Sequence, residues 1–230
     1  MQWTVPNILT LIRLVAAPMV ALVFLLLPRP FSDWIALILF LSASLTDYLD
    51  GVLARRWGQE TKFGAMMDPI ADKAMVVIAL AVVLGLYGTV AFGGTILFNA
   101  MVLVPVVVIL FREVFVSGLR EFLGEVAGTL KVTRLAKWKT FVQMVAIGLM
   151  FSFGLFDHYF GRWTEGMDGT LIQGILDGAV PDEFGLSWLY MGLIGSSFGA
   201  LALLWIAAVL TLVTGADYFL KARPHLRDGG

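Results

Sequence analysis

The stretch SLTDYLDGVLARRWGQETKFGAMMDPIADK, residues 44–73, places four aspartates between two of the most apolar parts of the chain. These aspartates are Asp47, Asp50, Asp68 and Asp72. A charged side chain is costly to bury in hydrocarbon, and it is retained there mainly where it is paired or where it has a function. The question that this stretch raises is what neutralises four carboxylates in so apolar a chain.

The composition is typical of a membrane protein with several spans. Of the 230 residues, 59% are hydrophobic and only 14% are charged, against about 25% charged in soluble domains. The net charge of −1 predicts no nucleic-acid partner. The chain has no cysteine, which excludes disulfides, and its two histidines, His158 and His225, are far from the aspartates in the sequence. Metal sites built on histidine or cysteine are therefore disfavoured.

Apolar runs long enough to cross a membrane predict the fold. A helix needs about 20 apolar residues to span the hydrocarbon core. Six runs meet this length, at about 8–27, 34–54, 65–87, 95–117, 135–156 and 187–220. We expect an all-α integral membrane bundle of six transmembrane helices, forming one domain over residues 1–230, with a short amphipathic lead-in at the N-terminus. The one long loop, after the fifth span, is expected to hold a short helix near residues 170–176.

The distribution of basic residues predicts the orientation, because lysine and arginine collect on the cytoplasmic side. With six spans, one side has only Arg29 and Arg162, and the other has fourteen basic residues. These fourteen are Arg13, Arg55, Arg56, Lys62, Lys73, Arg112, Arg120, Lys131, Arg134, Lys137, Lys139, Lys221, Arg223 and Arg227. We expect a multi-pass protein of the inner (cytoplasmic) membrane with both termini and the aspartates on the cytoplasmic side.

Helical spacing can bring the four carboxylates together. Asp47 and Asp50 are three positions apart and Asp68 and Asp72 are four apart, so each pair shares one face of a helix. The short link at 55–63 makes the two helices antiparallel neighbours. The sequence thus predicts that all four carboxylates line one shallow cavity at the cytoplasmic end of the two helices.

Like charges at such close range need a counterion. Ligand sets with oxygen alone suit Mg²⁺, Mn²⁺ or Ca²⁺ rather than zinc, and two such ions form the clamp used in phosphoryl chemistry. Two other interpretations stay open, namely ordinary charges at helix ends and a divalent-cation transporter. A transporter typically has midplane carboxylates and internal repeats, whereas these carboxylates lie toward one end and no repeat is visible.

Small residues beside the aspartates leave room for a ligand. Gly51 and Ala54 lie on or near the aspartate face of the second span, and Gly64 opens the third. Small residues let another helix or a flat ligand approach the backbone closely. Arg55 follows directly, and a guanidinium beside metal-bound anions suggests a phosphate-containing ligand.

These residues form one motif, Asp47-x2-Asp50-Gly51-x2-Ala54-Arg55-x8-Gly64-x3-Asp68-x3-Asp72. At every fixed position it resembles the signature of the CDP-alcohol phosphotransferases. The resemblance extends over the whole chain, because that family has six membrane helices with the motif on the second and third. It implies a site open to the cytoplasm, two divalent metals and a homodimer. It also implies the reaction, in which a hydroxyl attacks the phosphate next to the lipid of a CDP-linked lipid and CMP leaves.

The resemblance also implies roles for the motif residues. The metal ligands would be Asp47, Asp50 and Asp68, and Asp72 would be the general base with a share in the second metal. The nucleotide-binding residues would be Gly51, Ala54 and Gly64 around the cytidine and Arg55 at the phosphates. Asn7 and Thr10 near the N-terminus either cap the first helix or contribute to nucleotide binding, and their cytoplasmic location favours the second interpretation.

Basic residues on the metal side of the membrane suggest the acceptor alcohol. Four parts of the chain resemble the bacterial phosphatidylglycerophosphate synthase branch of the family. They are PNILTLIRL at 6–14, Arg112-Glu113, Ser117 with Leu119-Arg120-Glu121, and Lys137-x-Lys139-Thr140-x-x-Gln143. That branch implies CDP-diacylglycerol as donor and sn-glycerol 3-phosphate as acceptor, in contact with membrane lipids. The expected contacts to the acceptor phosphate are Arg112, Arg120, Lys137 and Lys139. Topology alone also accounts for basic residues here, and inositol phosphate, serine or phosphatidylglycerol remain alternative acceptors.

Overall fold

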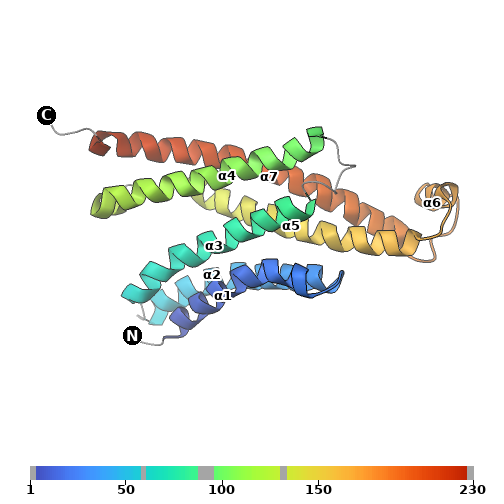
Figure 1. The fold of residues 1–230 in the computed structure, drawn as a ribbon, viewed down its shortest axis with the longest axis horizontal. Helices are drawn as coiled ribbons and strands as arrows, with labels where there is room; N and C mark the ends of the chain where they lie inside the picture. The colour runs from blue at the N-terminus through green and yellow to red at the C-terminus, as the bar shows by residue number, and fades with distance from the viewer. Residues whose placement is uncertain (1–3, 58–60, 88–95, 130–133, 227–230) are drawn as a thin grey trace. The chain divides into compact units, whose positions relative to one another are not determined.

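The structure, a computed structural model, describes residues 4–57, 61–87, 96–129 and 134–226, and only the backbone at 48–57, 87, 96–99, 125, 129 and 134. Every regular element in these ranges is helical (Figure 1). The elements are α1 (Val5–Leu26), α2 (Phe31–Trp57), α3 (Lys62–Tyr87), α4 (Ile96–Leu123), η1 (Gly124–Thr129), α5 (Arg134–Thr164), α6 (Gly169–Leu176), α7 (Leu186–Ala222) and η2 (Arg223–Leu226). The predicted all-α class is confirmed.

Within the described residues, five of the expected spans are helices long and apolar enough to cross a membrane, which makes this a multi-pass membrane protein. They cover Val5–Leu26, Lys62–Leu86, Ala100–Leu123, Leu135–Thr164 and Leu186–Leu226. The remaining expected span corresponds to α2, which forms a helix of 27 residues but is not among these five. The count of six is therefore not confirmed. The short helix expected in the long loop is α6, whereas His158, expected in that loop, lies within α5.

Helix α1 begins without a separate lead-in helix in the described chain. The Thr4 side chain caps the helix by accepting a hydrogen bond from the backbone N–H of Asn7 at 3.5 Å. Pro6 lies in the first turn, where its missing N–H costs nothing. The segment expected to be amphipathic thus forms the first turns of α1, and the capping residue is Thr4 rather than Asn7 or Thr10.

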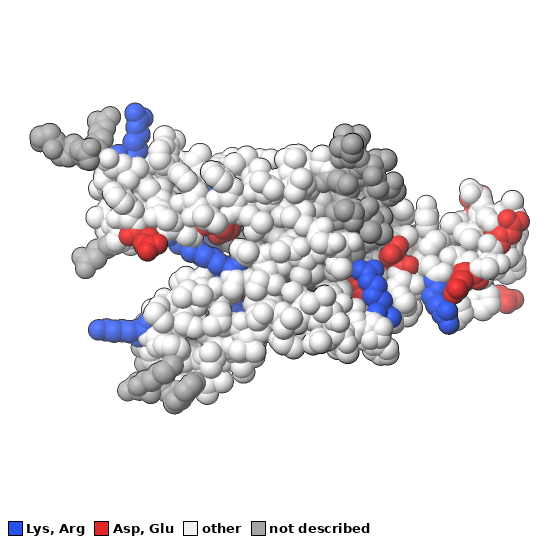
Figure 2. All heavy atoms as spheres, in the orientation of Figure 1, with Lys and Arg blue, Asp and Glu red and all other residues white. Residues whose placement is uncertain are grey.

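Large apolar side chains cover much of the outside of the molecule. On α1, the exposed fractions of Ile12 and Val15 are both 58%. On the face that Figure 2 shows, most atoms belong to uncharged residues, and the described charged side chains form a few separate groups. An apolar outer surface is expected where lipid, not water, surrounds the helices.

The described chain forms two compact units that share three helices. The first unit contains Met1–Val83 and Ile147–Ala200, and the second contains Leu84–Ala146 and Leu201–Gly230. Helices α5 and α7 therefore each contribute one part to each unit, and the end of α3, from Leu84, belongs to the second. In the following, each unit is described by itself.

Aromatic residues in the first unit join three helices. The ring of Phe151 on α5 packs edge-on against Phe40 on α2, with centroids 5.8 Å apart, and lies 6.3 Å from the ring of Phe24 on α1. Further along, Trp34 Nε1 donates to the hydroxyl of Tyr159 at 3.2 Å. These contacts hold α2, which carries the first aspartate pair, against α1 and α5.

In the second unit, α4 packs along the C-terminal half of α7. Trp205 Nε1 donates to the carbonyl of Met101 at 2.9 Å. Toward the other end of α4, Val116 and Leu123 form an apolar cluster with Tyr218 and Ala222. The contacts at both ends set the register of α4 against α7.

Candidate functional site

A stripe of polar residues lies buried on one side of α1. Asn7, Thr10 and Arg13 are 3%, 1% and 2% exposed, respectively. Their spacing of three positions places them on successive turns of one helix face. Because α1 is a membrane span, each of these side chains needs a polar partner inside the protein.

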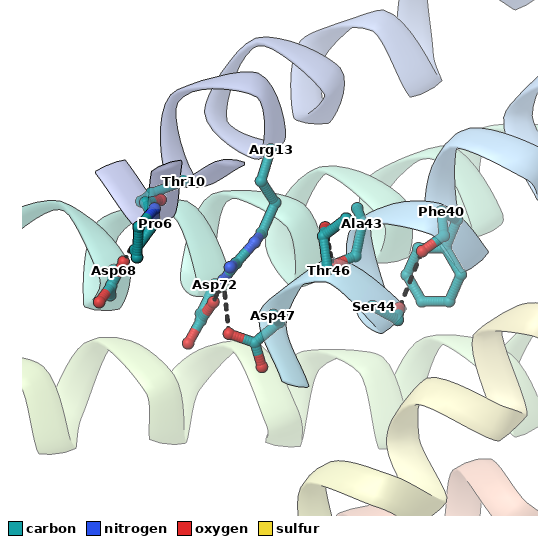
Figure 3. Close-up of polar contacts among 10 residues, drawn as sticks. All are labelled: Pro6, Thr10, Arg13, Phe40, Ala43, Ser44, Thr46, Asp47, Asp68 and Asp72. Atoms are coloured by element: carbon teal, nitrogen blue, oxygen red, sulfur yellow. Dashed lines mark hydrogen bonds and ion pairs between the residues drawn. The ribbon is translucent and has the colours of Figure 1, made fainter. Parts of the chain in front are cut away.

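Arg13 finds its partners on two other helices (Figure 3). Its Nη1 donates to Asp47 Oδ1 on α2 at 2.5 Å, and the same nitrogen donates to Asp72 Oδ1 on α3. The Asp47 and Asp72 side chains are 41% and 45% exposed, respectively. The carboxylates therefore converge on one buried cation while remaining accessible from outside.

Thr10 holds a third aspartate one turn earlier. Its Oγ1 donates to Asp68 Oδ1 at 2.6 Å and also lies 3.1 Å from the carbonyl of Pro6 (Figure 3). A hydroxyl has one proton to donate, so the shorter contact to Asp68 is the stronger of the two. Thr10 thereby fixes the position of the Asp68 carboxylate.

Thr61 connects Asn7 to Gly64 at the first turns of α1 and α3. Thr61 Oγ1 donates to Asn7 Oδ1 at 2.9 Å and accepts the backbone N–H of Gly64 at 3.0 Å, as an N-cap of α3 does. A Cβ on Gly64 would lie only 2.8 Å from Asn7 Oδ1. In this structure, the absence of a side chain at Gly64 makes room for α1.

The structure brings together part of the predicted acidic cluster. Asp47 and Asp72 meet at Arg13, and Asp68 lies one turn away at Thr10. The side chains of Asp50, Gly51, Ala54 and Arg55 lie outside the described residues. Among the described side chains, no group of three histidine, cysteine or acidic residues is close enough to hold a metal.

The two converging carboxylates nevertheless fit a cation. Their Oδ1 atoms point at one positively charged nitrogen, so the Arg13 guanidinium stands in for a positive charge at this place. The donor set is made of carboxylate oxygens alone, which is the chemistry of magnesium and manganese sites. The residues present therefore suit a hard divalent cation.

A separate pair of cations lies in the second unit. Glu113 Oε1 accepts hydrogen bonds from Arg112 Nη1 at 3.2 Å and from Lys139 Nζ. The side chains of Arg112 and Lys139 are 14% and 8% exposed, respectively. One carboxylate thus holds two largely buried cations, and this group keeps a net charge of +1.

Helix α7 makes room for this pair. A Cβ on Gly215 would lie 2.9 Å from Cγ of Arg112 and 3.5 Å from its Nε. On α5, Gln143 lies one turn after Lys139 and is also buried, with 2% of its surface exposed. The pair is therefore enclosed by α4, α5 and α7.

The other two basic residues expected at the acceptor have different surroundings. Arg120 places its guanidinium 5.3 Å from the centre of the Tyr218 ring, two turns beyond Arg112 on α4. Lys137 is exposed, because about 200° of helix rotation separates it from Lys139. The structure thus joins Arg112 to Lys139 through Glu113, whereas Lys137 lies on the opposite side of α5.

Sequence patterns did not identify Arg13, Glu113 or Gly215 as parts of these groups. Arg13 was counted among the basic residues that indicate orientation, although an arginine this deep in an apolar span is itself a signal of function. In the sequence, Glu113 stands out only as part of the Arg112-Glu113 stretch. No sequence pattern indicated Gly215.

Comparison with known proteins identifies the family. The sequence profile described as CDP-alcohol phosphatidyltransferase matches residues 3–172, which include both aspartate pairs and the Arg112–Lys139 group. The chain belongs to the CDP-alcohol phosphatidyltransferase family. It is therefore an enzyme, and nothing in these comparisons supports the transporter alternative.

Relatives match this phosphatidyltransferase over its whole length. A protein of Cereibacter sphaeroides is 50% identical over 228 residues, covering 99% of both chains. A protein of Rickettsia bellii is 34% identical over 96% of both chains, and one of Escherichia coli is 32% identical over 99% of this chain and 100% of its own. All three are named CDP-diacylglycerol–glycerol-3-phosphate 3-phosphatidyltransferase.

Proposed function

We propose that this enzyme transfers the phosphatidyl group of CDP-diacylglycerol to sn-glycerol 3-phosphate, which gives phosphatidylglycerophosphate and CMP. The observation that carries the proposal is the match over the whole chain to relatives with that name, up to 50% identical. The Arg112–Lys139 pair supports it from the structure. An acceptor that carries its own phosphate suits a site with two enclosed cations.

In this proposal, the acidic site holds two divalent ions, Mg²⁺ or Mn²⁺. The ligands would be Asp47, Asp50 and Asp68, with a share from Asp72. Bound ions would neutralise charge on the diphosphate of the donor lipid. Gly51, Ala54, Arg55 and Gly64 would bind the cytidine nucleotide. Asn7 and Thr10 would position the site through Thr61 and Asp68, their partners in the structure.

Asp72 is the proposed general base. Its side chain is 45% exposed, so an acceptor hydroxyl can reach it. The carboxylate takes the hydroxyl proton while the oxygen forms a bond to the phosphorus that bears diacylglycerol. The bond from that phosphorus to the bridging oxygen breaks, and CMP leaves with this oxygen. Asp72 then gives its proton to water and is ready for another cycle.

Two further parts of the proposal concern assembly and location. The family resemblance supports a homodimer, and the excess of basic residues on one side supports cytoplasmic termini in the inner membrane. Because the chain has no cysteine, single cysteines placed at either terminus or in the loop after α6 would report orientation. Labelling of a terminal cysteine by an impermeant maleimide in intact cells would contradict a cytoplasmic terminus.

The test of the reaction uses the purified chain in detergent with CDP-diacylglycerol. CMP release should depend on glycerol 3-phosphate, stop with EDTA and return with Mg²⁺ or Mn²⁺. Serine, inositol phosphate and phosphatidylglycerol are the comparison acceptors. Product with one of these and none with glycerol 3-phosphate would change the acceptor and leave the family assignment intact.

A further inference from the structure

Arg13 is an unusual residue for the middle of a membrane helix. Eight positions of α1 precede it, counted from Val5, and only 2% of its surface is exposed. An arginine at such a place is retained where it has a partner or a function. Here the partners are two aspartates of the acidic site, contributed by α2 and α3.

The position of the guanidinium excludes a metal ion at the same point. Its Nη1 lies 2.5 Å from Asp47 Oδ1 and also bonds Asp72 Oδ1, whereas Mg²⁺ needs its oxygens at about 2.0–2.1 Å. The nitrogen and a divalent ion therefore cannot hold the same pair of oxygens. The permanent charge of arginine would also repel the ion.

We propose that Arg13 is a built-in counterion that competes with a divalent cation for Asp47 and Asp72. In the metal-free enzyme, Arg13 keeps the two carboxylates together and neutralises part of their charge. When metal binds, the guanidinium gives up these oxygens and needs another anion. The diphosphate of the nucleotide-lipid is the anion that the proposed function brings to this site.

Charge balance points in the same direction. The four aspartates carry four negative charges, and two divalent cations would offset all of them. The guanidinium of Arg13 then adds one positive charge to the loaded site. A diphosphate is negatively charged and suits the planar donor geometry of a guanidinium. Arg13 is thus assigned as a positioning residue for carboxylates and donor phosphates.

The test compares Mn²⁺ binding to the full-length enzyme in detergent, measured by electron paramagnetic resonance. Removing a competing cation should raise metal affinity, so Arg13→Gln should bind Mn²⁺ about tenfold more tightly, within the usual range of coupling between two ligands. Arg29→Gln is the matched control, since it removes an Arg–Asp pair, with Asp33 at 3.5 Å, outside this site. It should bind Mn²⁺ as the wild type does.

A second readout separates this role from a structural one. Arg13→Gln should transfer phosphatidyl groups more slowly although it binds metal more tightly, because the donor phosphates lose a contact. A residue needed only for folding would weaken both properties together. If Arg13→Gln does not fold, the test uses nuclear magnetic resonance of the arginine side chains in the wild-type enzyme instead. The Arg13 signal, assigned by its loss in Arg13→Lys, should shift as Mg²⁺ is added.

The outcomes distinguish this inference from the proposed metal site on which it rests. If the wild type binds Mn²⁺ and Arg13→Gln binds it equally or less tightly, the competition is wrong and the metal site stands. An Arg13 signal that does not shift when Mg²⁺ binds would also contradict the competition and leave the metal site standing. If neither protein binds a divalent cation, the metal site and the competition both fall.

Discussion

Arg13 on α1 and Asp72 on α3 form an ion pair although 59 positions separate them in the chain. The same guanidinium nitrogen reaches Asp47 on α2, so three helices meet at one buried charge. Removal of these carboxylates would leave the buried charge of Arg13 uncompensated, which is destabilising. The Arg13 contacts therefore connect the stability of the first unit to the geometry of the acidic site.

Replacing Asp72 by asparagine should abolish transfer while binding of CDP-diacylglycerol persists. The amide keeps the size of the side chain but cannot accept the hydroxyl proton, and general bases contribute about 10²–10⁴-fold to rates. Asp72→Glu should keep a trace of activity, because misplacing a group by about 1 Å can cost 10²-fold. Single-turnover CMP release measures both variants.

Asp217→Asn is the control for Asp72. It removes an acidic partner of Lys221, 2.7 Å away on α7, and should release CMP at the wild-type rate. Near-normal release by Asp72→Asn would exclude Asp72 as the base.

The buried cations Arg112 and Lys139 should affect the KM for the acceptor and not the KM for the donor lipid. Arg112→Gln or Lys139→Gln should raise the KM for glycerol 3-phosphate by about tenfold or more, since hydrogen bonds to charged groups contribute about 1.5–3 kcal/mol. The exposed Lys137 on the same helix as Lys139 is the matched control, and Lys137→Gln should change this KM little. Equal effects at all three positions would speak against a specific phosphate site.

Gly215 should influence acceptor binding although it carries no side chain. A Cβ there would lie 2.9 Å from Arg112 Cγ, so Gly215→Ala should displace Arg112 and raise the KM for glycerol 3-phosphate. Gly195→Ala on the same helix meets nothing within 4 Å and should leave KM unchanged. An unchanged KM in both variants would show that the position of Arg112 is not critical.

The close contact between α1 and α3 should make Gly64 important for stability. Gly64→Ala places a Cβ 2.8 Å from Asn7 Oδ1, and such overpacking costs about 1–3 kcal/mol. Gly85→Ala on the same helix meets nothing within 4 Å and should be neutral or slightly stabilising, because glycine is unfavourable inside helices. Thermal unfolding in detergent compares the two, and equal midpoints would contradict the packing argument.

The start of α7 should depend on pH through Asp182. Its carboxylate accepts the backbone N–H groups of Ser187 and Leu186, both at 2.8 Å, and these bonds, that of Ser187 most, lower the pKa of Asp182. Because the pKa is lower in the folded protein, the carboxylate stabilises the fold at pH values above the pKa of an unfolded aspartate, about 3.9. This stabilisation is lost as the pH falls through the pKa of the folded state.

Asp182→Asn isolates this contribution, because the amide oxygen still accepts a hydrogen bond but does not titrate. Hydrogen exchange at Leu186 and Ser187 should be slower in the wild type than in Asp182→Asn near pH 6. The difference should disappear in strong acid. Equal exchange in both proteins at every pH would contradict the role of the carboxylate.

The sequence alone determined the fold class and the family of the protein. Long apolar runs predicted the helices because hydrocarbon leaves the backbone no partner but itself. The spacing within each aspartate pair predicted a shared helix face. In the structure, Asp68 and Asp72 both contact α1, through Thr10 and Arg13, whereas the side chain of Asp50 lies outside the described residues. The motif identified the family, and the profile match confirms it.

Tertiary structure decided which of several similar residues meet. Lys137 and Lys139 are alike in the sequence, yet only Lys139 turns toward Glu113, and Arg13 interrupts an apolar run without any sign of the helix that it faces. Hydropathy and spacing describe one helix at a time, whereas these contacts depend on how each helix is rotated and against which neighbour it packs. That choice is set by the summed packing of many side chains from distant parts of the chain, which no local pattern contains.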